Sequence, residues 1–470
     1  MGLRLFNTLS RQEEQFTPIT PGEVKLYTCG PTVYDVAHIG NFRTFVFEDL
    51  LRRYLAFRGF EITHVMNITD VDDKTIRDSM AEGTSLGDFT SAYKQAFFED
   101  LKTLNIVPAH HYPAATEYIQ PMINMIQKLM DKGFAYQGDE GDVFFNIGQY
   151  PEYGRLTRIN PDQMRPGERV SSDEYEKEGI RDFALWKAMK PEDGEVQWSS
   201  PWGKGRPGWH IECSAMSTTL LGNHFDIHCG GVDNMFPHHE NEIAQSECTT
   251  GEPFVNYWMH AEFLLVDGRK MSKSLGNFYT LRQLVTDGYR PDAIRWMLMT
   301  THYRQKLNFS VERLDDAIKA IERLRGFQAR LEEWKSGTIG EADLGARAIM
   351  QFTEAMDQDL NISGGLAAVF ELVREGNRLL DNGEMSHQMA GGVLEALNQI
   401  NSVLGILDMS VENAAGLVDE TTIQDLIEAR KNARQALDFT RADALRAQLE
   451  NLGIELIDTP AGTRWKRRNS

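Results

Sequence analysis

The stretch Val24-Lys25-Leu26-Tyr27-Thr28-Cys29 is followed by Gly30-Pro31 and, after a helical segment, by the run Glu61-Ile62-Thr63-His64-Val65-Met66. Both runs predict short strands, and Gly30-Pro31 ends the first of them. Between them, residues 41–55 place their apolar side chains on one stripe at helical spacing. A strand, a helix and a second strand in this order predict a βαβ unit of a parallel sheet, whose ligands bind beyond the carboxyl ends of the strands.

The rest of the chain divides into segments by its pattern. α/β patterns occupy two separate stretches, which we expect to form two halves of one parallel-sheet domain, and the looser stretch between them indicates an insertion with a Met- and Ile-rich helix at 118–130. Amphipathic helices such as 317–331 and 365–380 follow, and Gly364-Gly365 and Gly391-Gly392 are expected to interrupt them, which favours a packed bundle over one long coiled coil. The expected segments are 1–100, 101–200, 201–268, 269–310, 311–408 and 409–470.

Composition excludes several classes of protein. No apolar run approaches the roughly 20 residues of a membrane-spanning helix, and residues 1–10 lack the apolar core of a signal peptide, so we expect a cytoplasmic protein. The four cysteines of so long a chain are then expected to be free thiols or metal ligands. The net charge of −20 argues against general attraction to nucleic acid, although basic residues gather at Arg464-Trp465-Lys466-Arg467-Arg468. Charge alone favours a solvated, frayed end for this tail.

Two segments carry residues suited to phosphate chemistry. The first contains His38-Ile39-Gly40-Asn41 between the first strand and its helix, where backbone N–H groups of a helix start suit a phosphate. Gly40 permits a close backbone approach and His38 can donate a hydrogen bond, although this segment taken alone favours a histidine that only caps a turn. The second segment, Lys270-Met271-Ser272-Lys273-Ser274, is a lysine-rich loop that would neutralise a polyphosphate or would simply lie on the surface.

A third segment has the residue types of a metal site. A helix that begins at Pro237 would place His238 and Glu242 four residues apart on one face, which is half of a zinc site, with cysteine thiolates as the remaining ligands. Spacing leaves His239, Glu240 and Cys229 as rival ligands. A polar helix start beside buried structural cysteines is the alternative without a metal.

Together these segments resemble one enzyme family. His38-Ile39-Gly40-Asn41 is similar to the HIGH signature and residues 270–274 to the KMSKS signature of class I aminoacyl-tRNA synthetases. The surrounding words resemble cysteinyl-tRNA synthetases: Tyr27 to Tyr34, Asn67 to Lys74, Gly205 to Ser214, Phe236 to Glu242, Ala442 to Arg446 and Gly462 to Trp465. The resemblance implies a Rossmann-type catalytic domain (1–100 and 201–268) with a connective insertion (101–200). It also implies a KMSKS loop and tRNA stem-contact region (269–310), a helical bundle (311–408) and a C-terminal anticodon-binding module (409–470).

The resemblance also implies one zinc ion per chain. Its ligands would be the residues that match the family's, and the sulfur of the substrate cysteine would be a further ligand. An apolar pocket rejects serine poorly, because a difference of one group is worth about 1–3 kcal/mol, whereas zinc favours a soft thiolate. We therefore expect no separate editing domain. The zinc ligands so implied are Cys29, Cys213, His238 and Glu242.

The reaction implied is cysteine activation by ATP and transfer of the cysteinyl group to the 3′ end of tRNA(Cys). Lys273, assisted by Lys270, would stabilise the phosphates, with Mg²⁺ on the departing pyrophosphate. ATP would lie near His38, Gly40, Asn41 and both lysines, with His38 counted among the catalytic residues. Residues implied around the substrate are Thr69, Trp209, His228 and Asp233.

Two departures from the family pattern and two other functions stay open. Asn41 replaces the last histidine of HIGH and keeps a hydrogen-bond donor, and Cys229 stands where a glycine is usual. A ligase resembling cysteine:glucosaminyl-inositol ligase shares the catalytic half, but the helical and basic C-terminal parts suit an RNA anticodon arm instead. A catalytically inactive RNA-binding paralogue is opposed by the intact ligands and lysines. We expect a monomer without a membrane partner.

Overall fold

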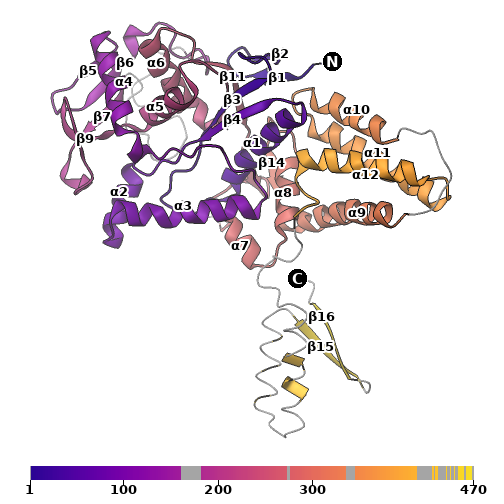
Figure 1. Ribbon diagram of the computed structural model, residues 1–470. Coiled ribbons are helices and arrows are strands. Elements are labelled where there is room, and N and C mark those ends of the chain that lie inside the picture. Colours follow the sequence, from indigo (N-terminus) through magenta and orange to yellow (C-terminus); the bar gives the residue numbers. More distant parts are fainter. Residues whose placement is uncertain are drawn as a thin grey trace. The chain divides into compact units, whose positions relative to one another are not determined.

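The computed structural model describes residues 2–159, 182–272, 276–334 and 344–409, together with two strands and a few isolated helical positions further on (Figure 1). By its contacts the chain divides into two compact units. One unit comprises Met1–Leu281 and Asp292–Met409, and the other comprises Arg282–Pro291 and Ser410–Ser470. The expected sheet, insertion and bundle all belong to the larger unit.

A four-stranded parallel sheet lies at the centre of the larger unit, with the strand order β11-β10-β3-β4. The expected βαβ unit is confirmed as β3 (Glu23–Thr28), α1 (Ile39–Phe57) and β4 (Glu61–Met66). The other two strands, β10 (Phe225–Gly231) and β11 (Val255–Ala261), come from the second α/β stretch. The two halves of the domain therefore form one continuous sheet.

The helices between these strands build the walls of the site. α5 (Trp209–Leu221) precedes β10, and α6 (Glu240–Thr250) lies between β10 and β11. We expected the second helix to begin at Pro237; regular α-helix begins at Glu240, after a wide turn over Met235–His239 in which Phe236 has extended backbone angles. Phe236 is the one residue of this turn with non-helical angles, and an extended residue directly before a proline is usual, so the helical path resumes at Pro237, where we expected it to begin.

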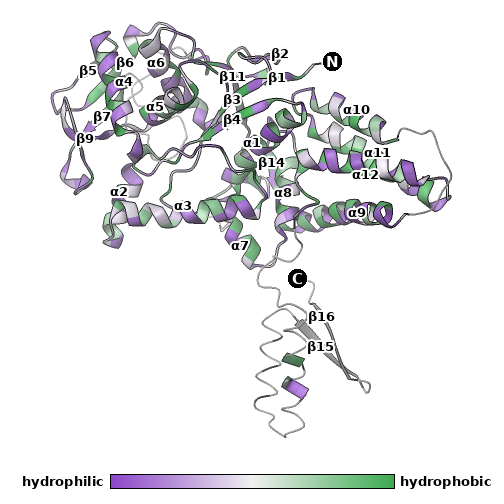
Figure 2. Ribbon diagram, in the orientation of Figure 1, coloured by the Kyte–Doolittle hydropathy of each residue, from purple (hydrophilic) through white to green (hydrophobic). Residues whose placement is uncertain are grey.

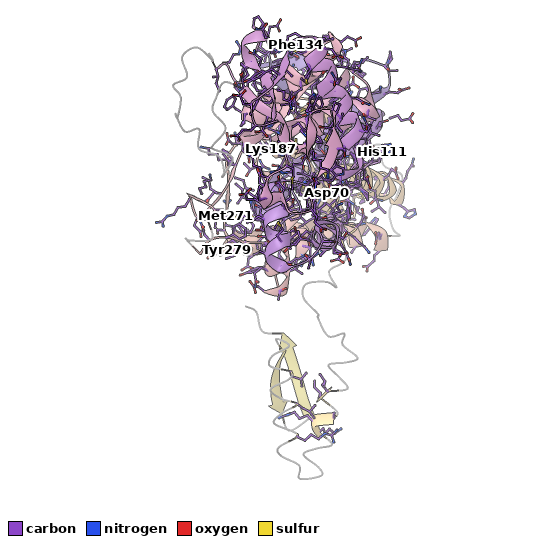
Figure 3. The ribbon with its side chains drawn as sticks, turned by 90° about the vertical axis from the view of Figure 1, so that its left-hand side faces the viewer. Asp70, His111, Phe134, Lys187, Met271 and Tyr279 are labelled. Atoms are coloured by element: carbon purple, nitrogen blue, oxygen red, sulfur yellow. The ribbon has the colours of Figure 1, made fainter. Side chains whose placement is uncertain are left out.

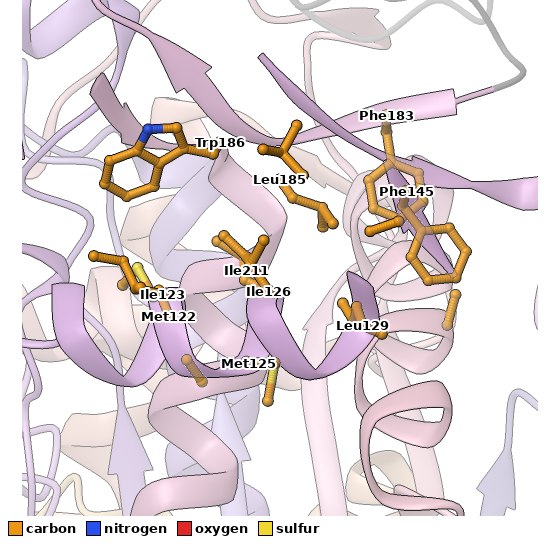
Figure 4. Close-up of a cluster of buried hydrophobic side chains, with 14 of the residues drawn as sticks. Met122, Ile123, Met125, Ile126, Leu129, Phe145, Phe183, Leu185, Trp186 and Ile211 are labelled. Carbon is orange, nitrogen blue, oxygen red and sulfur yellow. The ribbon is translucent and has the colours of Figure 1, made fainter. Parts of the chain in front are cut away.

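The insertion is a five-stranded antiparallel sheet in the order β5-β6-β7-β9-β8, packed against α4 (Ile119–Asp131). Figure 4 shows apolar side chains of α4, among them Met122 and Ile126, directed toward Leu185 and Trp186 of the sheet and Ile211 of α5. The helix was expected from the sequence, whereas this sheet was not. One of its strands, β9, lies beyond residue 200, where we expected the insertion to end. The strands are β5 (Ala135–Gln137), β6 (Val143–Asn146), β7 (Asp182–Ala188), β8 (Trp198–Ser200) and β9 (Gly203–Pro207).

The remaining elements of the larger unit connect the sheet to its surroundings. An N-terminal hairpin consists of β1 (Arg4–Asn7) and β2 (Gln12–Gln15), and a small sheet has the order β13-β12-β14. Its strands are β12 (Leu264–Val266), β13 (Arg269–Lys270) and β14 (Leu307–Phe309). Further helices of this unit are α2 (Asp73–Glu82), α3 (Leu86–Thr103) and α8 (Pro291–Thr300). The short helix α7 (Leu281–Thr286) belongs, apart from its first residue, to the smaller unit. Short helical turns are η1 (Ala115–Glu117), η2 (Ile147–Gln149), η4 (Pro191–Asp193), η5 (Val232–Asn234), η6 (Met235–His239) and η8 (Val311–Arg313).

The bundle consists of α9 (Leu314–Glu333), α10 (Leu344–Met356), α11 (Ile362–Asp381) and α12 (His387–Leu404). Hydrophobic and hydrophilic residues alternate along these helices in Figure 2, as expected for amphipathic helices.

The glycine pairs of the bundle do not interrupt its helices, so that part of the prediction is wrong. Both pairs lie inside helices, Gly364-Gly365 in α11 and Gly391-Gly392 in α12. A Cβ added to Gly345 of α10 would stand 2.5 Å from the carbonyl oxygen of Gly392. Gly345 and Gly392 therefore allow α10 and α12 to pack closely, and neither marks a turn.

In the smaller unit, β15 (Ile454–Thr459) and β16 (Gly462–Arg467) form an antiparallel hairpin. The basic run from Arg464 therefore lies largely on a strand and not on a frayed end, while Arg468 is outside the described residues. Within the described part of the chain, every helix is too short or too polar to cross a membrane.

Candidate metal centre and active site

The chemistry-bearing residues gather beyond the carboxyl ends of the parallel strands. Cys29 directly follows β3, Thr69 follows β4, and His228 lies near the end of β10. Cys213 comes from the first turns of α5 and Glu242 from the start of α6. This edge of a parallel sheet is the usual position of a ligand site.

Four of these side chains form a compact cluster. One ligand atom each of Cys29, Cys213, His238 and Glu242 lies within 4.8 Å of every other. Nε2 of His238 stands 3.1 Å from Oε1 of Glu242, as expected for residues four apart on one helical face. All four residues are at most 8% exposed. Two thiols, an imidazole and a carboxylate are a donor set that suits Zn²⁺.

The protonation chemistry of the cluster fits a bound cation. A hydrogen bond to Cys213 and burial raise the pKa of the Cys29 thiol well above its usual value, and burial raises the pKa of Cys213. Burial also lowers the pKa of His238 to about 3, so its ring is neutral, the form that binds metals. Oε1 of Glu242 is buried and accepts no hydrogen bond. A divalent cation would replace the thiol protons and satisfy this oxygen.

The structure shows which of the three rival ligands lie near the cluster. Cys229 pairs in register with Thr28, so its side chain lies on the sheet face opposite that of Cys29. The carboxylate of Glu240 accepts hydrogen bonds from the backbone amides of Gly154 and Thr157, at 2.9 and 3.0 Å, and so points away from the cluster. His239 does approach, with Nε2 3.1 Å from Sγ of Cys29.

A pocket lies beside the cluster, and Trp209 forms part of its wall. The indole stacks on His238 with ring centroids 4.2 Å apart and an interplanar angle of 24°. His210, whose Nδ1 is 2.9 Å from Nδ1 of His238, also lines the pocket. Further lining residues are Val71, Asp72, Asp73, Ile147, Tyr153, Phe183, Ala184, Lys187, Arg206, Pro207, Phe236, Pro237 and Asn241.

The other expected substrate residues lie at different depths. Thr69 is buried, and its hydroxyl donates a hydrogen bond of 2.9 Å to Oε2 of Glu212. His228 is fully buried, with Nε2 3.0 Å from Oε2 of Glu242, so it belongs to the floor behind the cluster. Asp233 is exposed, and its carboxylate lies over Gly231, where an added Cβ would stand 2.3 Å from Oδ1.

His38 and Asn41 form a reciprocal cap at the start of α1. Nδ1 of His38 accepts a hydrogen bond of 3.1 Å from the Asn41 amide, and Oδ1 of Asn41 accepts one of 3.1 Å from the His38 amide. The sequence left two interpretations of His38, a helix cap and a phosphate-binding group. The cap uses Nδ1 and leaves the ring proton on Nε2, so it does not exclude phosphate binding. The Asn41 side chain uses its oxygen here, so its NH₂ group remains a donor.

The lysine-rich loop meets this helix start through Met271. A Cβ on Gly40 would stand 2.9 Å from the His38 ring and 3.3 Å from Cε of Met271. Asn277 stabilises the loop through two hydrogen bonds. Its Oδ1 accepts one of 2.9 Å from the Ser272 amide, and its Nδ2 donates one of 3.3 Å to the Lys270 carbonyl. Met271 and Tyr279, near the two ends of the loop, are labelled in Figure 3. Lys273 lies outside the described residues.

Comparisons with known proteins agree with this geometry. The family model described as the tRNA synthetases class I (C) catalytic domain matches residues 15–319, and the DALR domain model matches residues 351–408. A cysteine–tRNA ligase of Protochlamydia amoebophila is 50% identical to this chain over 99% of the chain and 98% of that protein. The chain belongs to the cysteine–tRNA ligase family. Relatives of the same name in Chlamydia caviae and Brachyspira hyodysenteriae are 49% and 48% identical, over 99% and 98% of this chain and 98% and 99% of theirs.

Solved class I synthetases share the fold of this cysteine–tRNA ligase family member. A Mycobacterium tuberculosis methionyl-tRNA synthetase in complex with methionyl-adenylate superposes with a TM-score of 0.59 at 14% identity, covering 86% of this chain and 94% of that chain. An Agrobacterium radiobacter LeuRS in complex with tRNA gives 0.60 at 12% identity, covering 87% of each chain. The expected fold class, a Rossmann-type parallel sheet with an insertion and a helical bundle, is thereby confirmed.

Sequence reasoning missed parts of this family member's site. The ring of His260, on the buried strand β11, lies with Nε2 2.8 Å from Nδ1 of His239, and Glu212 accepts from Thr69. A histidine on a buried strand could have been noticed, because that residue needs a polar partner there. The pairing of Glu212 with Thr69 joins α5 to the loop after β4, and spacing carries no signal for it.

Proposed function

We propose that this chain charges tRNA(Cys) with L-cysteine in two steps. The carboxylate of cysteine attacks the α-phosphate of ATP, which gives cysteinyl-adenylate and pyrophosphate. A hydroxyl of the terminal tRNA ribose then attacks the adenylate carbonyl and releases AMP. The observation that carries the proposal is the cluster of Cys29, Cys213, His238 and Glu242 beside a pocket, in a chain whose relatives are named cysteine–tRNA ligases.

The cluster would hold one Zn²⁺ through these four side chains. When bound, zinc would supply a soft Lewis acid that favours the cysteine thiolate over the serine hydroxyl. Trp209, stacked on His238, would bound the space for the substrate side chain and keep it close to the cluster. Rejection of serine would then rest on ligand chemistry, since the two side chains are too alike for the shape of an apolar pocket to separate them strongly.

Residues around the pocket would orient the amino acid. We assign Thr69 and Asp233 to the side of its amino group; the hydroxyl of Thr69 is already held by Glu212 at 2.9 Å. Because His228 is enclosed behind Glu242, its contribution to substrate binding would be indirect. A held hydroxyl and carboxylate orient an ammonium group without rearrangement during the reaction.

ATP would lie across the start of α1. The N-terminus of a helix favours phosphate, and His38 and Asn41 offer an Nε2–H and an NH₂ group there. Gly40 lets the backbone approach the nucleotide. Lys270 and Lys273 would stabilise the charge of the phosphates during transfer, with Lys273 as the principal group. Mg²⁺, when bound with ATP, would neutralise the departing pyrophosphate.

The tRNA would bind along the C-terminal half of the chain. The match of the DALR domain model to 351–408 supports a tRNA-binding role for the bundle, and the basic hairpin strand from Arg464 supports one for the module 409–470. Region 269–310 would contact the tRNA stem. We propose a cytoplasmic monomer, and we assign no editing role to the insertion.

Two assays test the proposal. Cysteine-dependent exchange of pyrophosphate into ATP would show adenylate formation, and attachment of labelled cysteine to tRNA(Cys) would show transfer. A ligase for a small amino sugar would give the exchange without the attachment, and an inactive paralogue would give neither. Both activities are expected, and either of these patterns would reject the proposal.

A further inference from the structure

A second group of four ligand atoms overlaps the first. Cys29, His228, His239 and Glu242 also lie with their ligand atoms within 4.8 Å of one another. This group shares Cys29 and Glu242 with the cluster described above, and two histidines replace Cys213 and His238.

The distances within this second group fit a four-coordinate ion. Nε2 of His239 lies 3.1 Å from Sγ of Cys29 and 3.9 Å from Oε1 of Glu242, and Nε2 of His228 lies 3.0 Å from Oε2 of Glu242. Bonds of about 2.0–2.3 Å in a tetrahedron place neighbouring ligand atoms about 3.3–3.8 Å apart. The observed separations lie around that range, so small movements of the side chains would suffice.

The outer ring nitrogens of both histidines are already held. Nδ1 of His228 is 3.3 Å from the carbonyl oxygen of Cys229, which can only accept, so Nδ1 carries a proton, and Nε2 is the ring nitrogen that faces Glu242. Nδ1 of His239 is 2.8 Å from Nε2 of His260, whose Nδ1 is 2.8 Å from Oγ1 of Thr8. Histidines that bind metals characteristically donate their other ring N–H to such a partner, which orients the ring.

The second group lies on the side of the cluster away from the pocket. His228 and His239 pack against Trp258, with ring centroids 4.6 and 5.1 Å apart, and Trp258 is 1% exposed. By contrast, His238 stacks on Trp209, which lines the pocket. Neither His228 nor His239 lines that pocket. An ion held by the second group would therefore not meet a substrate thiol.

We propose that Cys29, His228, His239 and Glu242 form a second divalent-cation site, mutually exclusive with the first and turned away from the pocket. Because the two groups share two ligands, one ion occupies one group at a time. The first group has two thiolates and is preferred by zinc, whereas the second has one thiolate and two imidazoles. The second group therefore holds the ion when the first is incomplete. The proposal concerns cation binding alone and does not depend on which amino acid is activated.

The adjacent histidines His238 and His239 provide a matched test in the full-length protein. Metal-free Cys213→Ser is titrated with Co²⁺, and the visible and thiolate charge-transfer bands are recorded. Co²⁺ is expected to bind with one thiolate in place of two. In this background, His239→Ala is expected to weaken Co²⁺ binding about 10-fold or more, whereas His238→Ala changes it by less than about twofold. With Cys213 present the order reverses, and His238→Ala is the damaging substitution.

Three results would overturn the proposal. They are loss of all Co²⁺ binding in Cys213→Ser, a greater effect of His238→Ala than of His239→Ala in that background, and equal effects of the two. Far-UV circular dichroism checks that each variant is folded. If an alanine variant does not fold, His238→Gln and His239→Gln are compared in the same way. The same order of affinities supports the second site, and any other order contradicts it.

Discussion

The Nδ1 atom of His38 accepts a hydrogen bond of 3.1 Å from the backbone amide of Asn41. This contact fixes the tautomer of a neutral ring, because an accepting Nδ1 leaves the proton on Nε2. The ring also meets Phe278 edge to face, with centroids 5.3 Å apart. The hydrogen bond that caps the start of α1 therefore also orients the imidazole ring of His38, with its Nε2–H as the donor.

Gly40→Ala should damage ATP chemistry without damaging the metal centre. The added methyl group would lie 2.9 Å from the His38 ring and 3.3 Å from Met271, so the ring must move. We expect kcat/KM for pyrophosphate exchange to fall about 10–100-fold, the usual size of a misplaced positioning group, with unchanged metal content. Gly326→Ala is the control, since an added Cβ there meets nothing within 4 Å. Equal activity in both variants would contradict the role given to His38.

Cys229→Ala should leave cation binding intact. Its side chain lies on the face of Thr28, toward α1, so it cannot join the thiols of Cys29 and Cys213. The two-thiolate band of the Co²⁺-loaded protein is expected to stay at full intensity in Cys229→Ala and to fall by about half in Cys213→Ala. A weaker band in Cys229→Ala would reject the four-ligand assignment.

Arg295→Met should destabilise the chain strongly. Arg295 and Asp49 are fully buried and form an ion pair of 2.6 Å, and Nε of Arg295 donates to the Leu404 carbonyl at the end of α12. Removal of one partner from a buried pair costs about 3–5 kcal/mol. Urea unfolding should show a loss of this order, reduced somewhat because Arg53 also pairs with Asp49. The exposed Arg374→Met should leave the transition where it is, and a wild-type transition for Arg295→Met would contradict the assignment.

Glu48→Gln should change how stability depends on pH. Burial raises the pKa of Glu48 well above its usual value, only partly offset by the Thr28 hydroxyl. The folded protein therefore keeps a proton that the unfolded chain releases above its ordinary pKa of 4.5. The free energy of unfolding of the wild type therefore falls as pH rises from that value toward the higher pKa of the folded state. The stability of Glu48→Gln relative to wild type should rise by up to about 1.4 kcal/mol per pH unit between about pH 5 and pH 7. The exposed Glu371→Gln serves as the control, and a flat difference for Glu48→Gln would refute the prediction.

Elements with strong local patterns were predictable from the sequence. The strand Glu61–Met66 has the expected bounds, and the expected helix at 118–130 is present as Ile119–Asp131. The five-stranded sheet of the insertion was not predicted, because its strands are short and one of its pairings, β7 with β9, joins strands that are not neighbours in sequence. Register between distant strands carries little local signal.

The site shows the same limit. Spacing indicated His238 and Glu242 as one half of a metal site but could not choose among Cys229, Glu240 and His239. The choice depends on which face of β10 a side chain occupies and on where the Glu240 carboxylate finds its partners, and both follow from tertiary contacts.

The most direct test compares activation of cysteine and serine by the same protein with and without its metal. Pyrophosphate exchange is measured with each amino acid on zinc-loaded protein and on protein stripped by a chelator, and zinc is then restored. The ratio of kcat/KM values should exceed about 10⁴ with zinc and fall to about 200 or less without it, the range that pocket shape alone supplies. Restored zinc should return the ratio. An undiminished ratio in fully metal-free protein would contradict the account.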